Sequence, residues 1–521
     1  MDKDLTTSVF TFETLIEGNF LYVDKTEYIW QLIKPTAAMY FLSRPRRFGK
    51  SLLISTLKAI FQGKKELFKG LALYDKPYEW EEFPVIHLSF GDYSVVSDPF
   101  QELPDYLMSK MRSIAGEHSM KLKENTPALC FAELIDKLAE KKPVVILIDE
   151  YDKPMLNNIS DSRIKEIRDC LKGFYSVLKD RNAKERLLFI TGVSKFSHVS
   201  LFSELNNLTD ITMRQEYAEM LGFTEEDVRK YFADMIPEAA RKNGLSEDEL
   251  MNNLLEWYDG YRFSEAETHV CNPVSITTFF ENKGRFSNYW DTTGTPSFLL
   301  EQFSKQSYDF EAALKETYDE SIFSAYELDR LDITGLLWQT GYLTIKELVP
   351  GPRRMKYRLG FPDFEVEDTF MSRLLEHFCN VPKGTAESNI ERFQAAIAQD
   401  DLNGFMALFQ AFLTRIPYGI HVKDEKYYQS IFFVIFRMLG LLIEAESQTN
   451  EGRIDAYVRT SKNIYIFEFK LNKTARKAVS QIIDRHYYEM FQSSGLPIRM
   501  VGVNINYTKG RIDGWKEMDL K

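Results

Sequence analysis

An unbroken apolar run between Lys142 and Glu150 constrains the fold of this 521-residue chain more than any other segment. It reads Lys-Pro-Val-Val-Ile-Leu-Ile-Asp-Glu and lacks the polar alternation of a strand with one solvated face. Continuous runs of this kind are typical of parallel strands that are buried on both faces. The segment therefore predicts a central strand of an α/β sheet, with Asp149 and Glu150 at its carboxyl end.

A basic loop near the N-terminus precedes a segment with helical spacing. The segment from Phe41 to Ser51 reads Phe-Leu-Ser-Arg-Pro-Arg-Arg-Phe-Gly-Lys-Ser. A phosphate-binding loop needs backbone N–H groups at a helix start, a lysine for the phosphates and a hydroxyl for Mg²⁺. Gly49, Lys50 and Ser51 match the second half of the G-x-x-x-x-G-K-[ST] pattern, but Arg44 occupies the position of its first glycine.

Two further arginines, Arg46 and Arg47, make this loop more cationic than the usual pattern, and we expect them to help hold nucleotide phosphates. Taken alone, the segment could also be a basic turn before a core helix. The acids that follow about 100 residues later favour the phosphate-loop interpretation. In P-loop ATPases the first such acid holds Mg²⁺ and the second polarises the attacking water. We therefore expect Ser51 and Asp149 at a Mg²⁺ ion and Glu150 as the catalytic base.

Two more segments fit the same sheet. Residues 83–90 predict a strand between the loop and the acids, and Leu187–Gly192 predicts a strand after them. The second segment ends in polar residues, among them Thr191 and Ser194. Because ligands of open α/β sheets bind outside the carboxyl ends of the strands, we expect these two side chains to contribute to binding ATP.

A second candidate site lies near the C-terminus. Residues 452–455 (Gly-Arg-Ile-Asp) and 464–470 (Ile-Tyr-Ile-Phe-Glu-Phe-Lys) predict two strands of a hairpin. Glu468 and Lys470 are two residues apart, so they share one face of a strand, and Asp455 can lie beside them. Two carboxylates can hold Mg²⁺, and a lysine can assist an attacking water, as phosphodiester hydrolysis requires. The alternative is a solvated strand end of mixed charge.

These motifs, together with several others, resemble those of the bacterial AAA-ATPase-like family with a C-terminal nuclease-like domain of the PD-(D/E)XK class. The resemblance covers almost the whole chain, and it lies in residues 22–26, 44–51, 148–152, 191–197, 207–212, 257–263, 271–273, 289–290, 341–343, 452–455 and 468–470. The loop without its first glycine is the family's own pattern. The resemblance implies an ATP-binding module joined to a restriction-endonuclease-like fold.

The order of elements after Pro417 is similar to that of PD-(D/E)XK nucleases, with a helix, three strands and a second helix over residues 474–491. In such enzymes a glutamate on the first helix often joins the metal ligands. Glu425 is the candidate for that role and Glu446 its rival. On the second helix Gln481 orients substrate or Lys470, unless it is an ordinary surface glutamine.

The net charge of the chain restricts how it can contact nucleic acid. The formal net charge is −12, so any contact with nucleic acid must come from local clusters of Lys and Arg. The expected partner is nucleic acid, with DNA favoured over RNA, and no membrane is expected. The competing function is a nucleotide-controlled switch whose nuclease-like domain binds without cleaving, and the acidic charge favours it. The four cysteines show no zinc spacing or disulfide framework, which suits a reducing cytosol.

We therefore expect a multi-domain α/β protein with ATP and Mg²⁺ as cofactors. The predicted domains are a P-loop ATPase core with a parallel sheet (residues 1–215), a helical lid and connecting region (216–416) and a restriction-endonuclease-like α/β domain (417–521). The N-terminus lacks the features of a signal peptide, so a cytoplasmic location is expected. ATP-dependent self-association is an option, with Arg46, Arg47 or Arg214 as the arginine finger.

Overall fold

The computed structural model describes residues 3–93, 98–159, 161, 163–195, 201–202, 205, 207–290, 308, 310–324, 332–379, 383–414, 434, 448–449, 452–453, 456–506, 509 and 511–520. The chain divides into two compact units. Unit 1 comprises Met1–Thr292 and Thr317–Val366, and unit 2 comprises Thr293–Glu316 and Glu367–Lys521. The three domain boundaries expected from the sequence stay predictions.

A parallel five-stranded sheet forms the centre of unit 1, in the order β2-β3-β4-β1-β5. Its strands are β1 (Ala38–Ser43), β2 (Val85–Ser89), β3 (Val144–Asp149), β4 (Glu185–Gly192) and β5 (Thr209–Asp210). Every residue of β3 is buried, as its apolar sequence predicts for a strand covered on both faces. The predicted α/β fold class with a parallel sheet is confirmed.

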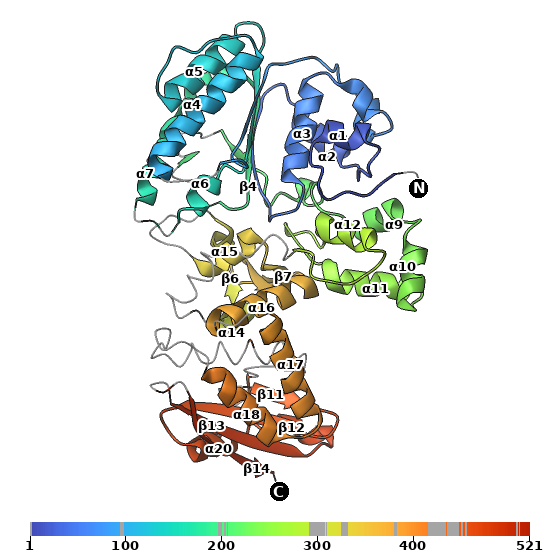
Figure 1. Cartoon of the computed structure of the whole chain (residues 1–521), viewed down its shortest axis with the longest axis vertical. Helices are drawn as coiled ribbons and strands as arrows, with labels where there is room; N and C mark the ends of the chain where they lie inside the picture. Colours follow the sequence, from blue (N-terminus) through green and yellow to red (C-terminus); the bar gives the residue numbers. More distant parts are fainter. Residues whose placement is uncertain are drawn as a thin grey trace. The chain divides into compact units, whose positions relative to one another are not determined.

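Helices cover both faces of this sheet (Figure 1). On one side lie α1 (Phe12–Glu17), α2 (Thr26–Ile33) and α3 (Lys50–Phe61). On the other lie α4 (Pro99–Glu117), α5 (Pro127–Leu138) and α7 (Ile164–Ser176). The short helix α6 (Lys153–Leu156) follows β3, and the 3₁₀ turns are η1 (Lys65–Phe68), η2 (Ala72–Asp75) and η3 (Lys179–Lys184).

A group of short helices follows the sheet and belongs to the same unit. Its elements are η4 (Gln215–Tyr217), α9 (Glu225–Tyr231), α10 (Ile236–Asn243), α11 (Glu247–Tyr258) and α12 (Pro273–Glu281). We call α9–α12 the helical region. Its core is apolar and includes Phe232, Leu254 and Phe279. Two capping boxes start α9 and α11, since Thr224 and Ser246 each bind the backbone N–H three residues later.

The rest of unit 1 is a small antiparallel sheet in the order β6-β8-β7, beside one helix. The elements are β6 (Thr317–Tyr318), η6 (Glu320–Phe323), α15 (Ile333–Thr340), β7 (Thr344–Pro350) and β8 (Met355–Gly360). The basic turn at residues 351–354 joins β7 to β8.

Unit 2 contains a mixed four-stranded sheet in the order β11-β12-β13-β14. Its strands are β11 (Ala456–Arg459), β12 (Ile464–Leu471), β13 (Ile498–Asn506) and β14 (Arg511–Asp519), and a separate two-stranded ladder joins β9 (Gln448–Thr449) to β10 (Gly452–Arg453). The helices are α14 (Phe310–Lys315), α16 (Phe364–Cys379), which begins at the end of unit 1, α17 (Lys383–Ala398), α18 (Leu402–Leu413), α20 (Ala475–Asp484) and the 3₁₀ turn η8 (Glu489–Ser494).

The two faces of β12 pack against different helices, because successive side chains of a strand point to opposite faces. Phe467 and Phe469 contact aromatic rings of α18, whereas Ile464 and Ile466 share a core with Ile482 of α20. Figure 1 shows α18 and α20 on opposite sides of the sheet. This mixed α/β arrangement agrees with the predicted restriction-endonuclease-like class.

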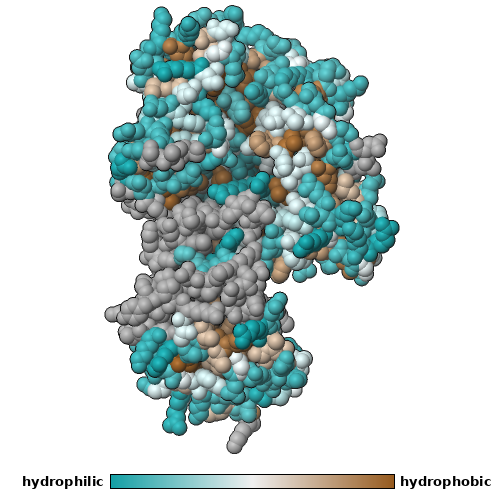
Figure 2. Space-filling model, viewed as in Figure 1, coloured by the Kyte–Doolittle hydropathy of each residue, from teal (hydrophilic) through white to brown (hydrophobic). Residues whose placement is uncertain are grey.

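Hydrophilic residues cover most of the described surface that Figure 2 shows, and the hydrophobic residues there form small separate patches. Among the described residues no helix has both the length and the apolar character that a membrane span requires.

Candidate functional site

The loop between β1 and α3 has the backbone of a tight turn. Arg47 and Gly49 both adopt positive φ, 68° and 86°, and α3 begins directly after them at Lys50. A side chain at Gly49 would meet no atom within 4 Å, so its left-handed backbone is what favours glycine there. The first N–H groups of α3 lack intrahelical acceptors, which makes this helix start suited to an anion.

The carboxyl end of β3 meets the start of α3. Ser51 donates a hydrogen bond of 2.6 Å from Oγ to Asp149 Oδ2, and Asp149 is 3% exposed. The other oxygen, Asp149 Oδ1, is buried and accepts no hydrogen bond from the part of the chain that the structure describes. Burial raises the pKa of Asp149, while the Ser51 hydrogen bond and the Lys50 charge act in the opposite direction.

Lys50 lies in the same place and is 7% exposed. Its ammonium donates to two carbonyl oxygens of the loop itself, Arg44 O at 2.9 Å and Pro45 O at 2.8 Å. Burial lowers the pKa of Lys50 to about 8, against the opposing charges of Asp149 and its neighbouring acids. The loop thus brings together a cation, a hydroxyl and a buried carboxylate, as predicted for binding a nucleotide phosphate with Mg²⁺.

Glu150 follows Asp149 in the sequence, but its carboxylate contacts Lys153 and not Lys50 or Ser51. Its φ is +54°, unusual for a residue with a side chain, and Lys153 Nζ lies 3.3 Å from its Oε2. Lys153 also donates to Gly91 O, after the end of β2. Glu150 is about one third exposed, so water can reach its carboxylate. The structure therefore brings Glu150 to the carboxyl edge of the sheet without joining it to Lys50 or Ser51.

Thr191 and Ser194 reach the same edge, but their hydroxyls bind the protein. Thr191 Oγ1 donates to Leu42 O at 2.8 Å, and Ser194 Oγ donates to Asp152 Oδ2 at 2.8 Å. Both residues are fully buried. Asp152 also accepts from the N–H groups of Val193 and Ser194. Asp152 therefore holds the chain after β4, a role that the sequence did not indicate.

Arg44 replaces the first glycine of the motif and does not face the phosphate side. Arg44 is 1% exposed, and its guanidinium donates to Thr212 O at 2.6 Å and Tyr217 O at 3.2 Å. It also lies 4.2 Å from the ring centroid of Phe263. Burial lowers the pKa of Arg44 to about 9. Arg44 thus anchors the loop to later segments, and sequence reasoning missed this because its partners are about 170–220 residues away.

The remaining loop residues also pack on segments that come much later in the chain. Phe48 makes edge contacts with the rings of Tyr261 and Phe263, at 4.7 and 5.2 Å between centroids. A side chain at Gly341 would approach Pro45 Cβ to 2.5 Å, so this glycine permits the contact. The aromatic segment 257–263 is therefore part of the support of the loop.

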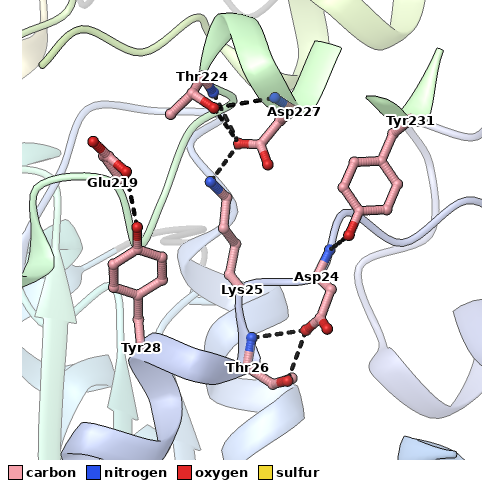
Figure 3. Close-up of polar contacts among 8 residues, drawn as sticks. All are labelled: Asp24, Lys25, Thr26, Tyr28, Glu219, Thr224, Asp227 and Tyr231. Atoms are coloured by element: carbon pink, nitrogen blue, oxygen red, sulfur yellow. Dashed lines mark hydrogen bonds and ion pairs between the residues drawn. The ribbon is translucent and has the colours of Figure 1, made fainter. Parts of the chain in front are cut away.

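A polar joint connects α2 and the segment before it to α9 and the residues that precede α9 (Figure 3). Lys25 Nζ lies 2.5 Å from Asp227 Oδ2, in the capping box of α9, and Tyr28 donates to Glu219 Oε2 at 2.8 Å. Asp24 accepts from both the N–H and the hydroxyl of Thr26 at the start of α2. Two sets of contacts, this joint and the loop support, therefore hold the sheet and the later part of unit 1 together.

Of the arginine-finger candidates, Arg46 is half-buried, while Arg47 and Arg214 are exposed. Asn272 Nδ2 lies 3.4 Å from Arg46 O, so the backbone of the loop is held at this point too. The exposed side chains of Arg47 and Arg214 remain available to a ligand or a second protein copy.

In unit 2 the predicted strand carries the predicted pair. Glu468 is fully buried, and Lys470 Nζ lies 2.7 Å from its Oε1. Asp455 lies outside the described residues, but the next residue, Ala456, pairs with Phe467, the neighbour of Glu468. A hairpin is present, but its first strand is β11 (Ala456–Arg459) and not residues 452–455 as predicted, because residues 452–453 pair with β9.

Of the other candidate residues of the nuclease-like site, only Gln481 is among the described residues. Glu425 and Glu446 lie outside the described residues. Gln481 is half-buried on α20, which ends at Asp484 instead of continuing to residue 491 as predicted. The positive φ of His486, 50°, turns the chain out of the helix, and η8 follows. The strands β13 and β14 were not predicted, although the apolar residues of β13 signal one.

The two candidate Mg²⁺ sites differ in how many of their expected oxygen ligands the structure describes. In unit 1, Ser51 Oγ and the available Asp149 Oδ1 are the hard oxygen donors that Mg²⁺ prefers. In unit 2, Glu468 is the one carboxylate of the predicted pair that the structure describes. Among the described residues no group of three His, Cys, Asp or Glu side chains is arranged as a complete metal ligand set.

Comparison with known proteins assigns a family to each of the two parts of the chain that carry these sites. A family model described as a predicted AAA-ATPase matches residues 7–202, and one described as the PD-(D/E)XK nuclease superfamily matches residues 423–515. The "Uncharacterized protein in vnfD 5'region" of Azotobacter chroococcum mcd 1 is 35% identical over 526 residues, covering 98% of each chain. That name assigns no activity.

Proposed function

The chain belongs to the family of predicted AAA-ATPases with a C-terminal PD-(D/E)XK nuclease-superfamily domain, and we propose that it hydrolyses ATP and cleaves nucleic acid. In this proposal an ATPase module controls a Mg²⁺-dependent nuclease module. The observation that carries it is the grouping of Lys50, Ser51 and Asp149 at one helix start.

Each residue of the ATP site has a chemical role in this proposal. Lys50 would leave the loop carbonyls and bind the β- and γ-phosphates, since phosphate oxygens are stronger acceptors for an ammonium than neutral carbonyls. Ser51 and Asp149 would hold Mg²⁺, which offsets the charge of the phosphates. Glu150 would accept a proton from the attacking water. Its partial exposure supports a role toward water.

In the nuclease module, Asp455 and Glu468 would hold Mg²⁺ and Lys470 would assist the attacking water. The burial of Glu468 and Lys470 as a pair supports this assignment. Removing two charges from water costs free energy, so we expect such a pair to have a function or a geometry that offsets this cost. The predicted preference is for DNA over RNA. Glu425 or Glu446 would complete the ligand set.

The competing proposal is a nucleotide-controlled switch whose nuclease-like module binds without cleaving. Two observations favour it, namely the net charge of −12 and the direct pairing of Glu468 with Lys470, which satisfies both charges without a substrate. Both proposals share the ATP site, so only the nuclease module separates them.

The ATPase part is tested with Glu150→Gln, whose amide keeps the shape but cannot accept a proton. We expect nearly normal ATP binding with hydrolysis slower by about 10²-fold or more. Glu166→Gln, at an exposed position of α7, is the matched control and should hydrolyse ATP at the wild-type rate. Wild-type hydrolysis by Glu150→Gln would remove Glu150 from the mechanism.

The nuclease part is tested by cleavage of plasmid and oligonucleotides with and without ATP and Mg²⁺. Asp455→Ala and Lys470→Ala should both abolish cleavage, but only Asp455→Ala should weaken metal binding, because the loss of the Lys470 charge does not remove a ligand. If wild type cleaves neither DNA nor RNA under any nucleotide condition, the switch proposal replaces the nuclease proposal.

A further inference from the structure

A run of cations without acids begins at the predicted nuclease site. From Lys470 to residue 483 the sequence contains four basic residues and no acid, in a chain whose net charge is −12. Three of the four, Lys473, Arg476 and Lys477, are exposed. We call these three residues the basic rim.

The three side chains of the basic rim have no ionic partner among the described residues. Some other surface lysines do pair with acids, for example Lys64 with Glu13 at 2.5 Å and Lys76 with Glu27 at 2.6 Å. No rim side chain forms an ion pair or hydrogen bond with any residue that the structure describes. Three neighbouring cations therefore remain open to an external anion.

The rim begins on the short connection that leaves the strand of Glu468. β12 ends at Leu471 and α20 starts at Ala475, so Lys473 lies on a three-residue link. The N–H of Lys473 donates to Asn504 Oδ1 at 2.7 Å, and Asn504 is the register neighbour of Lys470 on β13. This hydrogen bond holds the link against the end of the sheet where Lys470 lies.

The first turn of α20 is fixed close to Glu468 by a glycine. Gly502 is the register neighbour of Glu468, and a Cβ atom placed on it would come within 2.3 Å of Ala475 O. Adjacent strands are about 4.8 Å apart, so the first turn of α20 packs on the strand next to β12, at the register of Glu468. Arg476 and Lys477 follow Ala475 directly and share its fixed placement.

We propose that the basic rim binds the backbone phosphates of nucleic acid and so brings a strand to Glu468 and Lys470. The proposal rests on the proposed nuclease function and names the surface that receives its substrate. A polyanion approaching a chain of net charge −12 is repelled unless local cations outweigh that field. Several neighbouring cations suit a polyanion, which presents phosphates at regular intervals along its strand, whereas a small anion would need converging donors.

The test measures binding without metal, so that cleavage cannot interfere. Fluorescence anisotropy of a labelled DNA duplex of about 20 base pairs in EDTA would be followed over a series of salt concentrations. For duplex DNA, the slope of log Kobs against log salt becomes shallower by about 0.9 for each phosphate that the protein no longer neutralises. We expect the triple variant Lys473→Gln, Arg476→Gln, Lys477→Gln to have a slope shallower by roughly 2 to 3 units and an affinity weaker by about tenfold or more.

Lys462→Gln is the matched control. Lys462 is also exposed and unpaired among the described residues, but it lies in the β11–β12 turn at the far end of β12. The 8 residues of β12 separate the two ends, which is about 25 Å. This variant should keep the wild-type slope and affinity. Because rim side chains are exposed, each single variant should fold, and its slope should change by roughly one unit or less.

The results separate this proposal from the proposed function. Unchanged slope and affinity in the triple variant would overturn the basic rim, even if wild type cleaves DNA. A shallower slope in the triple variant would support the rim, even if wild type cleaves nothing and the switch proposal holds. Equal competition by an acidic polypeptide of matched charge would overturn the assignment of nucleic acid as the ligand.

Discussion

Ser51 Oγ and Asp149 Oδ2 lie 2.6 Å apart, joined by a hydrogen bond between residues 98 positions apart in sequence. The hydroxyl occupies one carboxylate oxygen and leaves Oδ1 buried and without a partner among the described residues. The pair therefore leaves Asp149 Oδ1 as an oxygen donor for a hard cation.

The first prediction concerns Asp149→Asn, which keeps the shape and removes the charge. Binding of ATP with Mg²⁺ should weaken by roughly tenfold or more, because a neutral amide is a poor ligand for a hard cation. Binding of ATP in EDTA should change little. Calorimetry with and without Mg²⁺ measures both. Equal losses in the two conditions would contradict the assignment of Asp149 to the metal.

The second prediction follows from the pKa of Lys50, which burial lowers to about 8. If the protonated ammonium binds phosphate, ATP affinity should fall by about tenfold between pH 7 and pH 9, as the charged fraction drops from about nine tenths to about one tenth. Lys50→Met should bind weakly throughout this pH range. A wild-type affinity that stays constant over the same range would separate Lys50 from the phosphates.

The lowered pKa of Lys50 affects folding stability in the direction opposite to its effect on ATP affinity, since stability should increase as pH rises. The unfolded chain holds the Lys50 proton up to about pH 10.5, whereas the folded chain releases it near pH 8. The unfolded state binds more protons between these values, so the contribution of Lys50 to the free energy of unfolding should rise with pH over that window.

The third prediction concerns Arg44. Arg44→Leu removes the guanidinium and leaves the carbonyl oxygens of Thr212 and Tyr217 buried without their donor. Loss of buried charged hydrogen bonds costs about 2–4 kcal/mol of unfolding free energy. Thermal unfolding should show a lower Tm. Arg47→Leu, at an exposed position of the same loop, should leave Tm unchanged. If both variants are destabilised equally, the effect reflects loop charge and not the Arg44 anchor.

The fourth prediction concerns Glu185, at the start of β4. Both of its carboxylate oxygens are buried without a hydrogen-bond partner in the described chain, and burial raises its pKa to about 7. The folded state then binds the proton more tightly than the unfolded state, so stability should decline as pH rises from about 4.5 through 7. The decline is on the order of 3 kcal/mol.

Glu185→Gln cannot lose this proton and should flatten the decline. Urea unfolding at about pH 5 and about pH 8, followed by the tryptophan signal, should show a larger difference between the two pH values for wild type than for the variant. Glu166→Gln at a solvated position serves as the control. An identical pH dependence in wild type and Glu185→Gln would mean that Glu185 finds a partner in solution.

Strands whose consecutive residues follow a simple hydrophobic pattern could be predicted from the sequence. The run ending at Asp149 predicted β3, because burial on both faces leaves no polar position within the strand. The alternation around Glu468 predicted β12 in the same way, with its charged pair on one face. In contrast β14 has mostly exposed positions, and its polar sequence carries no such pattern.

Features that depend on distant residues could not be predicted. The presence of Arg44 in place of a glycine was visible, but the direction of its side chain was not, since Thr212 lies 168 residues further along. The hydroxyls of Thr191 and Ser194 were expected near phosphate, and the structure engages them with Leu42 and Asp152. Sequence spacing specifies which strand end a residue occupies but not which of several neighbours its side chain binds.

The anchoring of the phosphate loop by later segments also has a consequence for synthesis of the chain. Arg44 and Pro45 need Thr212 and Gly341 as neighbours, so a polypeptide released at residue 202 would have the motif without its support. On a ribosome adding roughly 5–20 residues per second, the stretch between residue 202 and Gly341 takes on the order of 10 seconds. The nascent loop should therefore remain unable to hold nucleotide until well after its own strand and helix have emerged.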